Sequence, residues 1–416
     1  MKTSVTTKAI EQAAKQLEGV VTRTPLELNK RLSKQYQATI YLKREDLQTV
    51  RSYKIRGAYN KMSLLSAADR KKGVVCASAG NHSQGVALSS CLLKIKSRIY
   101  MPQSTPRQKV DRAKDLGGPW VDLVMCGDTF DEANKEAVSY AKKNKKVFVH
   151  PFDDPKVITG QGTVGVEILN QLDQDVDYVV APIGGGGLVS GLGIYMKEKM
   201  PKVKLIGVES VGAPAMYESI KNNKITTLAS IDKFIDGTAV TKPGKHTFKI
   251  CNKIIDKMVL VPEGKVCQTM ISLYQSEGIV AEPAGALSIA ALDKIKDKIK
   301  GKTVVCVISG GNNDISRYSE IIERSLMYQG LKHYFIIEFP QRPGSLRMYL
   351  DNVLGENDDI ALFEYMKKSN RESGPALVGI ELNKKEDLKP LLKRMDDAEM
   401  TYQHISGDHI LFRFLL

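Results

Sequence analysis

The chain has 416 residues, of which 42% are hydrophobic and 26% are charged. This composition is typical of a folded globular protein and excludes extended disorder, and the length allows two to three domains. No apolar run approaches the roughly 18–20 residues that a membrane-spanning helix needs, which excludes an integral membrane protein. The N-terminal residues contain no apolar segment of the kind found in secretory signals, so we expect a cytoplasmic location.

The formal net charge is +14, which raises the possibility of nucleic-acid binding. Lysines cluster at residues 142–146 and 294–302, but neither cluster is interleaved with aromatic residues that stack on bases. We interpret both as solvated helix ends and predict no nucleic-acid partner. The six cysteines show no metal-ligand or disulfide spacing, so the sequence predicts free thiols, most of them buried, and no metal site.

From about residue 36 to residue 325, short β-branched runs alternate with stretches of helical periodicity, such as residues 131–144. The predicted strands are 38–45, 73–79, 97–102, 121–126, 146–150, 176–183, 204–210 and 303–309. Strands that alternate with helices indicate parallel sheets covered on both faces. Because this pattern is too long for one core, we predict two parallel-sheet subdomains of an α/β fold.

The pattern changes after a predicted helix at about 316–330. The next elements are predicted strands at 332–339, 359–368, 375–382 and 408–415, with a turn and helix at 340–354 and a helix at 385–397. The order β-α-β-β-α-β is that of a ferredoxin-like domain. We therefore predict a boundary at about 326–332, with one domain at 1–328 and a second at 332–416.

Lys54 lies in the first of four loops that follow predicted strands, where active sites of open α/β sheets gather. Most lysines are simply exposed surface residues. Arg44, Arg51 and Arg56 are close to Lys54 in the sequence, and a cationic setting favours the neutral, nucleophilic form of an amine.

The second loop, Ser78 to Gly85, joins a predicted strand to a predicted helix. A glycine-containing turn at a helix N-terminus offers free backbone N–H groups to a carboxylate or phosphate. The alternative is an ordinary helix start capped by Asn81. His82 is a candidate base, although a single histidine here is more often structural.

The third loop is a run of four glycines, Gly184 to Gly187, followed by Leu188. Without side chains its backbone amides can wrap closely around an anion. Neither register fits the G-x-G-x-x-G dinucleotide motif, and no Walker loop is present, so a cradle for a phosphate monoester is favoured. The fourth loop, Ser309 to Asn313, is a polar turn that carries no assignment by itself.

Together these segments resemble the fold-type II family of pyridoxal-phosphate (PLP) enzymes, and within it the biosynthetic threonine dehydratases. S-x-K-x-R-G-A, S-A-G-N-H, G-G-G-G-L, A-E-P-A-G-A and S-G-G-N-N occur in the family's order over nearly the whole chain. One of these motifs would be weak evidence, whereas five in order are highly specific. The resemblance implies a PLP-dependent lyase that converts L-threonine, and also L-serine, to a 2-oxoacid and ammonia. From threonine the product would be 2-oxobutanoate, in the first committed step of isoleucine biosynthesis.

The resemblance also implies roles for individual residues. Lys54 would bind PLP covalently and move the Cα proton, the glycine loop would hold the cofactor phosphate, Asn81 would face the ring hydroxyl, and Ser309 would lie against the pyridine nitrogen. The implied cofactor-binding residues are Lys54, Asn81, Gly184, Gly185, Gly186, Gly187, Leu188 and Ser309, and the implied substrate-binding residues are Ser78, Ala79, Gly80, Asn81 and His82. The leaving hydroxyl would take its proton from the cofactor phosphate.

Two further positions bear on the reaction. Related serine racemases have a serine at the place of Ala79 that protonates the opposite face of the carbanion, so alanine disfavours racemisation. Glu282, from A-E-P-A-G-A, is expected to line the site, and no proton-transfer role is assigned to it.

The C-terminal domain resembles the ACT-like regulatory domain of this family, in a short form with one such unit. That resemblance implies isoleucine as an inhibitor, with valine opposing it, in a homotetramer. Two other readings stay open: another fold-type II PLP enzyme, such as a serine dehydratase or threonine synthase, and a non-catalytic amino-acid sensor.

Overall fold

The computed structural model describes residues 5–367 and 371–405. The chain divides into two compact units, Met1–Asn313 and Asp314–Leu416, and each has hydrophobic clusters of its own. None of the helices in the described ranges is long and apolar enough to cross a membrane. Four of the six free cysteines are buried, and Cys91 and Cys126 are half-buried.

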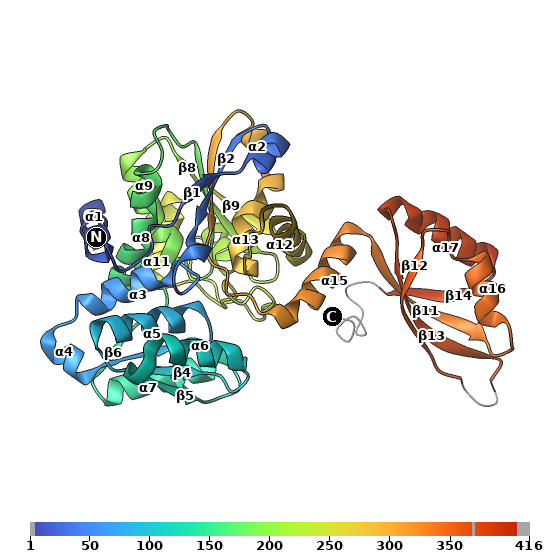
Figure 1. The fold of residues 1–416 in the computed structure, drawn as a ribbon, viewed down its shortest axis with the longest axis horizontal. Helices are drawn as coiled ribbons and strands as arrows, with labels where there is room; N and C mark the ends of the chain where they lie inside the picture. The colour runs from blue at the N-terminus through green and yellow to red at the C-terminus, as the bar shows by residue number, and fades with distance from the viewer. Residues whose placement is uncertain (1–4, 368–370, 406–416) are drawn as a thin grey trace. The chain divides into compact units, whose positions relative to one another are not determined.

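The first unit contains a small, fully parallel sheet of order β5-β4-β3-β6 (Figure 1). Its strands are β3 (Val74–Ala77), β4 (Ser97–Met101), β5 (Val121–Met125) and β6 (Val147–Phe148). The helices around it are α3 (Lys54–Ser63), α4 (Ala67–Lys72), α5 (Asn81–Leu93), α6 (Arg107–Gly117) and α7 (Phe130–Lys143). Apolar residues of α3, α5 and α6 form one cluster with the sheet, and three alanines of α7 form a separate cluster with it. The sheet is therefore covered on both faces.

Helix α7 illustrates how local sequence sets these elements. The Thr129 side chain accepts a hydrogen bond from the Glu132 N–H, and the Glu132 carboxylate accepts one from the Thr129 N–H. This capping box satisfies two N–H groups that would otherwise lack partners at the helix start. The helix predicted at 131–144 is confirmed as Phe130–Lys143.

A larger sheet of order β1-β2-β10-β7-β8-β9 completes the first unit, and only β1 runs antiparallel to its neighbour. Its strands are β1 (Leu26–Leu28), β2 (Thr39–Arg44), β7 (Tyr178–Pro182), β8 (Lys204–Ser210), β9 (Lys257–Val261) and β10 (Thr303–Ile308). The remaining helices are α1 (Thr7–Leu17), α2 (Lys30–Tyr36), α8 (Pro155–Leu169), α9 (Gly187–Lys199), α10 (Ala215–Lys221), α11 (Lys245–Ile254), α12 (Glu263–Glu277), α13 (Pro283–Ala290) and α14 (Lys296–Ile299). Short 3-10 turns lie at η1 (Glu45–Leu47), η2 (Gly118–Trp120) and η3 (Ala291–Lys294).

All eight strands predicted between residues 38 and 309 are present, which confirms two parallel-sheet subdomains. Two strands of this sheet were not predicted: β1, which has only three residues, and β9, whose run KMVLV carried a readable signal. β9 forms the parallel edge of the large sheet beside β8.

The second unit holds one antiparallel sheet of order β12-β13-β11-β14. Its elements are η4 (Ile315–Arg317), α15 (Tyr318–Gln329), β11 (Lys332–Pro340), α16 (Ser345–Asn352), β12 (Asp359–Tyr365), β13 (Ser373–Glu381), η5 (Lys385–Asp387), α17 (Leu388–Asp397) and β14 (Thr401–Ile405). Tyr349 of α16 and Leu391 of α17 belong to one cluster with the sheet, so both helices cover the same face (Figure 1). The first five elements of the predicted order β-α-β-β-α-β are confirmed, and in the described residues the order ends with a strand at Thr401–Ile405.

Two details of the second unit differ from the sequence analysis. β14 was not predicted, because its residues TYQHI are mostly polar, and the strand predicted at 408–415 lies outside the described residues. Helix α15 belongs by its contacts to the second unit, where Glu323 pairs with Lys332 at 2.7 Å. The division into a catalytic domain at 1–328 and a regulatory domain at 332–416 stays a prediction.

Candidate active site

The segment before Lys54 lies directly beside the loop after β10. Tyr53 N donates to Ser309 O at 3.2 Å, Gly311 N donates to Arg51 O at 2.8 Å, and Ser52 and Gly310 form a β-bridge. This pairing follows from the fold, since β2 and β10 are parallel neighbours whose carboxyl ends share one sheet edge. The first and fourth predicted loops are therefore brought together.

The second loop reaches the same place from the small sheet. A Cβ atom at Gly85 would lie 3.1 Å from the backbone carbonyl carbon of Lys54, so α5 and α3 pack closely here. Helix α5 begins at Asn81 with Gly80 as its N-cap, and within the described residues no side chain caps it. The alternative in which Asn81 caps the helix is wrong. Its side chain instead bonds to Glu282 and Asn312, and the first N–H groups of α5 are left for a ligand.

The glycine loop lies between β7 and α9. Gly186 adopts φ +92°, a left-handed conformation that favours glycine, and no described side chain caps the helix that follows. The Thr247 hydroxyl donates to Gly185 O at 2.6 Å and fixes the loop from outside. Bare backbone amides at the positive end of a helix form a cradle for an anionic group.

Phe152 closes one side of this cradle. A Cβ atom at Gly185 would lie 2.3 Å from the Phe152 ring, and one at Gly187 would lie 3.0 Å from the Phe152 Cβ. The neighbouring residue Pro151 accepts a hydrogen bond from Lys54 Nζ at 3.0 Å. The segment 151–152 therefore connects the lysine to the glycine loop, which completes the convergence of the predicted segments.

Gly185→Ala is expected to weaken binding of a phosphate-bearing ligand by about tenfold or more, because the new methyl group forces the loop or the Phe152 ring to move. The measurement is a titration of ligand-free protein with PLP, followed by visible absorbance. Gly165→Ala is the control, since a Cβ atom there lies no closer than 3.2 Å to Leu192 and Tyr195. Equal affinities for the two variants would contradict this account of the loop.

Burial of Lys54 lowers the pKa of its ammonium group to about 8, and the nearby Glu282 carboxylate opposes that shift. The predicted direction is confirmed, but the predicted cause, a cluster of arginines, is wrong. Arg44 pairs with Asp46 at 2.8 Å, and Arg56 pairs with Glu45 at 2.7 Å, so both charges are compensated. Desolvation is what favours the neutral amine.

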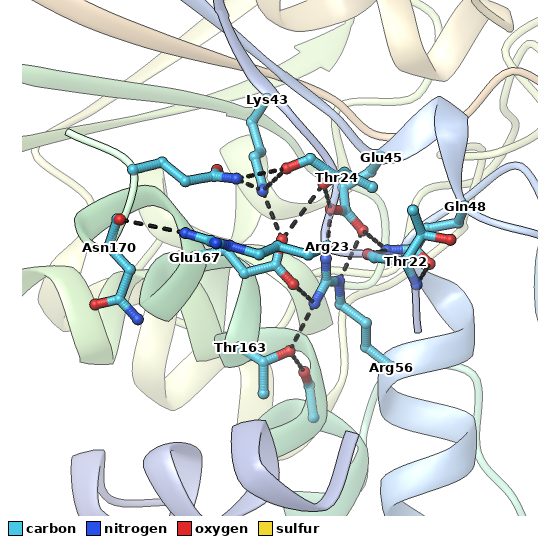
Figure 2. Close-up of polar contacts among 12 residues, drawn as sticks. Thr22, Arg23, Thr24, Lys43, Glu45, Gln48, Arg56, Thr163, Glu167 and Asn170 are labelled. Carbon is cyan, nitrogen blue, oxygen red and sulfur yellow. Dashed lines mark hydrogen bonds and ion pairs between the residues drawn. The ribbon is translucent and has the colours of Figure 1, made fainter. Parts of the chain in front are cut away.

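A buried ionic network, whose contacts Figure 2 shows, anchors the first turn of α3, the helix that begins at Lys54. Arg56 donates to both carboxylate oxygens of Glu45, at 2.7 and 2.8 Å, and to Glu167 of α8 at 2.6 Å. Lys43, which is 0% exposed, donates to Glu167 and to the Thr24 carbonyl, both at 2.6 Å. Although burial favours a neutral carboxyl group, the Arg56 guanidinium holds the pKa of Glu45 below its usual value. Two cations and two anions balance, and they tie α3 to β2 and α8.

His82 is buried and contacts the backbone, as a histidine with a structural role does. Its Nε2 lies 2.9 Å from the Val149 carbonyl, and burial lowers the pKa of the imidazole to about 3. A group with so low a pKa is a weak base near neutral pH. The structure therefore favours the structural interpretation over a catalytic base.

Ser309 is 3% exposed and lies at the end of β10, beside the start of α3. Phe152 and Asn312 were not predicted as individual site residues. Asn312 belonged to the S-G-G-N-N motif, so a signal was present, whereas an apolar residue after the strand at 146–150 offered none. Across the described residues no group of three or more His, Cys, Asp or Glu is arranged to hold a metal ion.

Comparisons with known proteins agree with this geometry. A family described as "Pyridoxal-phosphate dependent enzyme" matches residues 17–310. A second, "C-terminal regulatory domain of Threonine dehydratase", matches residues 323–415. The chain is thus a member of the PLP-dependent enzymes.

Full-length relatives narrow the assignment. A biosynthetic L-threonine dehydratase of Halalkalibacterium halodurans is 54% identical over 400 residues, covering 96% of each chain. One of Bacillus subtilis is 53% identical over 409 residues, covering 98% of this chain and 97% of the relative. The chain belongs to the family of biosynthetic L-threonine dehydratases.

Solved structures show the same fold. The processed form of threonine deaminase isoform 2 from Solanum lycopersicum is 39% identical with a TM-score of 0.72, covering 78% of this chain and 96% of that one. A serine racemase from Dictyostelium discoideum is 32% identical with a TM-score of 0.69, covering 75% of this chain and 99% of that one. The predicted family, fold class and PLP dependence are confirmed.

The residues on this site fit PLP. The cradle at Gly184 to Gly187 offers a phosphate backbone amides that carry no side chains of their own, and the half-buried Lys54 amine has the lowered pKa that covalent attachment to an aldehyde requires. Asn81 and Ser309 add polar groups for the ring.

Proposed function

We propose that this chain binds PLP through Lys54 and converts L-threonine, and L-serine as a second substrate, to the 2-oxoacid and ammonia. From threonine the product is 2-oxobutanoate, and the step is the first committed one of isoleucine biosynthesis. The observation that carries the proposal is the half-buried Lys54 amine, held at 3.0 Å on Pro151 O beside a glycine loop closed on one side by Phe152.

Each part of the site has a proposed task. PLP, when bound, supplies an electron sink for the substrate Cα. The backbone amides of Gly184 to Leu188 hold the phosphate, and the amides of residues 78–82 at the start of α5 hold the substrate carboxylate. Lys54 Nζ, neutral above a pKa of about 8, accepts the Cα proton. Ser309 would hold the pyridine nitrogen, where its neutral hydroxyl would temper the electron sink and favour β-elimination.

Ala79 supports elimination over racemisation. Racemisation needs a second proton donor on the opposite face of the substrate from Lys54, and the methyl side chain of Ala79 cannot supply a proton. We therefore propose that racemase activity is negligible next to dehydration.

The test is an assay of 2-oxoacid and ammonia formed from threonine and from serine by the purified full-length chain. We expect 2-oxobutanoate from threonine, with visible absorbance from the bound cofactor. A protein that binds PLP but forms another product would point to a different PLP enzyme, and a colourless, inactive protein would overturn the proposal.

We further propose that the part after residue 332 is regulatory, while residues 1–328 carry catalysis. In this proposal isoleucine inhibits and valine opposes it, within a homotetramer in the cytoplasm. The support is a second unit with its own core, formed by the sheet with α16 and α17, together with its match to a regulatory domain.

Removing this unit is expected to abolish the response to isoleucine while dehydration of threonine continues. An effector that couples by about 1–3 kcal/mol changes substrate affinity by about 5- to 150-fold. Two shortened chains are informative: one ending near residue 328, and one ending at Asn313, which also removes α15. We would measure the rate of threonine dehydration by each chain with and without isoleucine, and the heat of isoleucine and valine binding to the full chain by calorimetry. No heat with isoleucine or valine, and unchanged kinetics in all chains, would leave the unit structural.

A further inference from the structure

The amide group of Asn81 is held at both of its ends. Its Nδ2 donates to Glu282 Oε1 at 2.6 Å, and its Oδ1 accepts a hydrogen bond from Asn312 Nδ2 at 2.7 Å. The same Asn312 nitrogen donates to the Val50 carbonyl at 2.8 Å, and a carbonyl only accepts. The Val50 contact therefore fixes Asn312, and Asn312 with Glu282 fixes which end of Asn81 is the nitrogen.

This arrangement leaves Asn81 with one N–H not engaged by Glu282. An amide NH₂ has two donors, and the carboxylate takes one of them. Rotated by half a turn, the amide would place its oxygen against the Glu282 carboxylate and its nitrogen against the Asn312 nitrogen. Both contacts would then be lost, so the network selects a single orientation.

Glu282 is itself committed to this contact. It occupies the N-cap position of α13, yet in the described structure its side chain makes no capping bond to that helix. It is 5% exposed, its N–H donates to Gly310 O at 3.1 Å, and a Cβ atom at Gly310 would lie 2.4 Å from its Oε1. The absence of a side chain at Gly310 makes the room for the carboxylate.

We propose that Glu282 and Asn312 are positioning residues that hold Asn81 with an N–H directed to the cofactor's ring hydroxyl. This inference rests on the proposed function, in which Asn81 faces that hydroxyl. Without the two partners the amide rotates freely and presents its oxygen as often as its nitrogen, so the cofactor loses a fixed donor.

Because Glu282 can gain or lose a proton, the strength of its hydrogen bond with Asn81 should depend on pH. A purely steric support of Asn81 would show no such dependence. The charged and titratable groups around it are Tyr53 and Lys54 at the start of α3, Lys109 of α6, and Asp236 in the loop after α10. Burial and Asp236 raise the pKa of Glu282 to about 7, whereas Asn81, Lys109 and the Asn312 N–H favour its ionised form. Below this pKa the carboxyl gains a proton and becomes a weaker acceptor for Asn81.

A double-mutant cycle between Glu282→Gln and Asn81→Ala tests the proposal, with PLP affinity of the ligand-free full chain as the readout. Each single variant is expected to bind PLP about tenfold more weakly. The double variant should match Asn81→Ala to within about twofold, because Glu282 acts through Asn81. Titrations from about pH 6 to about pH 8.5 should show wild-type affinity falling in two steps, one near pH 8 from Lys54 and one near pH 7 from Glu282, and Glu282→Gln should keep only the step near pH 8.

Glu209→Gln is the matched control. Glu209 is also a buried carboxyl group, with a pKa raised to about 8 by burial, and it accepts the N–H groups of Met216 and Tyr217. Its replacement should leave the Asn81→Ala effect on PLP affinity unchanged. A full tenfold effect of Glu282→Gln in the Asn81→Ala background would overturn the positioning role. A wild-type chain that does not bind PLP would instead overturn the proposed function.

Discussion

Lys54→Ala is expected to lose the visible absorbance of the bound cofactor and to lower threonine turnover by about a thousandfold or more. The variant removes both the amine that attaches PLP and the base for the Cα proton, each of which contributes a large factor. Absorbance spectra of the purified variant and 2-oxobutanoate formation make the measurement. Full activity in this variant would contradict the assignment of the whole site.

Lys61→Ala is the control, because Lys61 lies on the same helix and pairs with Asp154 at 2.7 Å. It is expected to keep colour and turnover. The pKa of Lys54 adds a second check: its amine is charged below about pH 8 and neutral above it. The rate of PLP binding to ligand-free protein should therefore rise with pH through that value, and a flat profile would argue against Lys54 as the nucleophile.

The fold could be predicted where one segment carries its own pattern. The strands at 178–182 and 303–308 are buried, β-branched runs, and α7 has helical spacing with a capping box. β1 and β14 were missed because pairing with a neighbouring strand makes these segments extended. Leu26–Leu28 pairs with β2, and the polar Thr401–Ile405 pairs with β11. Such long-range contacts leave little trace in the local sequence.

The candidate site, like the fold, could be predicted from the sequence only in part. The motifs around Lys54, Asn81, the glycine loop and Ser309 were readable, and the fold brings them to one place. The Asn81–Glu282 bond joins residues 201 positions apart, and no local pattern could have shown it. The cause of the shifted Lys54 pKa was misread for a related reason. Arg44 and Arg56, two of the three neighbouring arginines, are paired in the fold, and burial decides the shift.

Loss of one member of the network behind Lys54 is expected to be the most destabilising change in this part of the fold. Glu45→Gln leaves the buried Arg56 without its bidentate partner, and Glu167 then faces both Arg56 and Lys43 alone. Breaking a buried ion pair by removing one partner costs about 3–5 kcal/mol, because an uncompensated charge stays buried.

Glu45→Leu combined with Arg56→Met is expected to destabilise less than Glu45→Gln. It removes one anion and one cation together and leaves the Lys43–Glu167 pair, at 2.6 Å, in balance. Trp120 is the single tryptophan of the chain and lies in the first unit, so its fluorescence during urea unfolding reports this unit alone. Asp111→Asn, which breaks an exposed pair with Arg107, is the control and should cost about 0–1 kcal/mol. If Glu45→Gln proved as mild as that control, the network would not be what anchors α3, and the placement of Lys54 would depend on its packing against α5 instead.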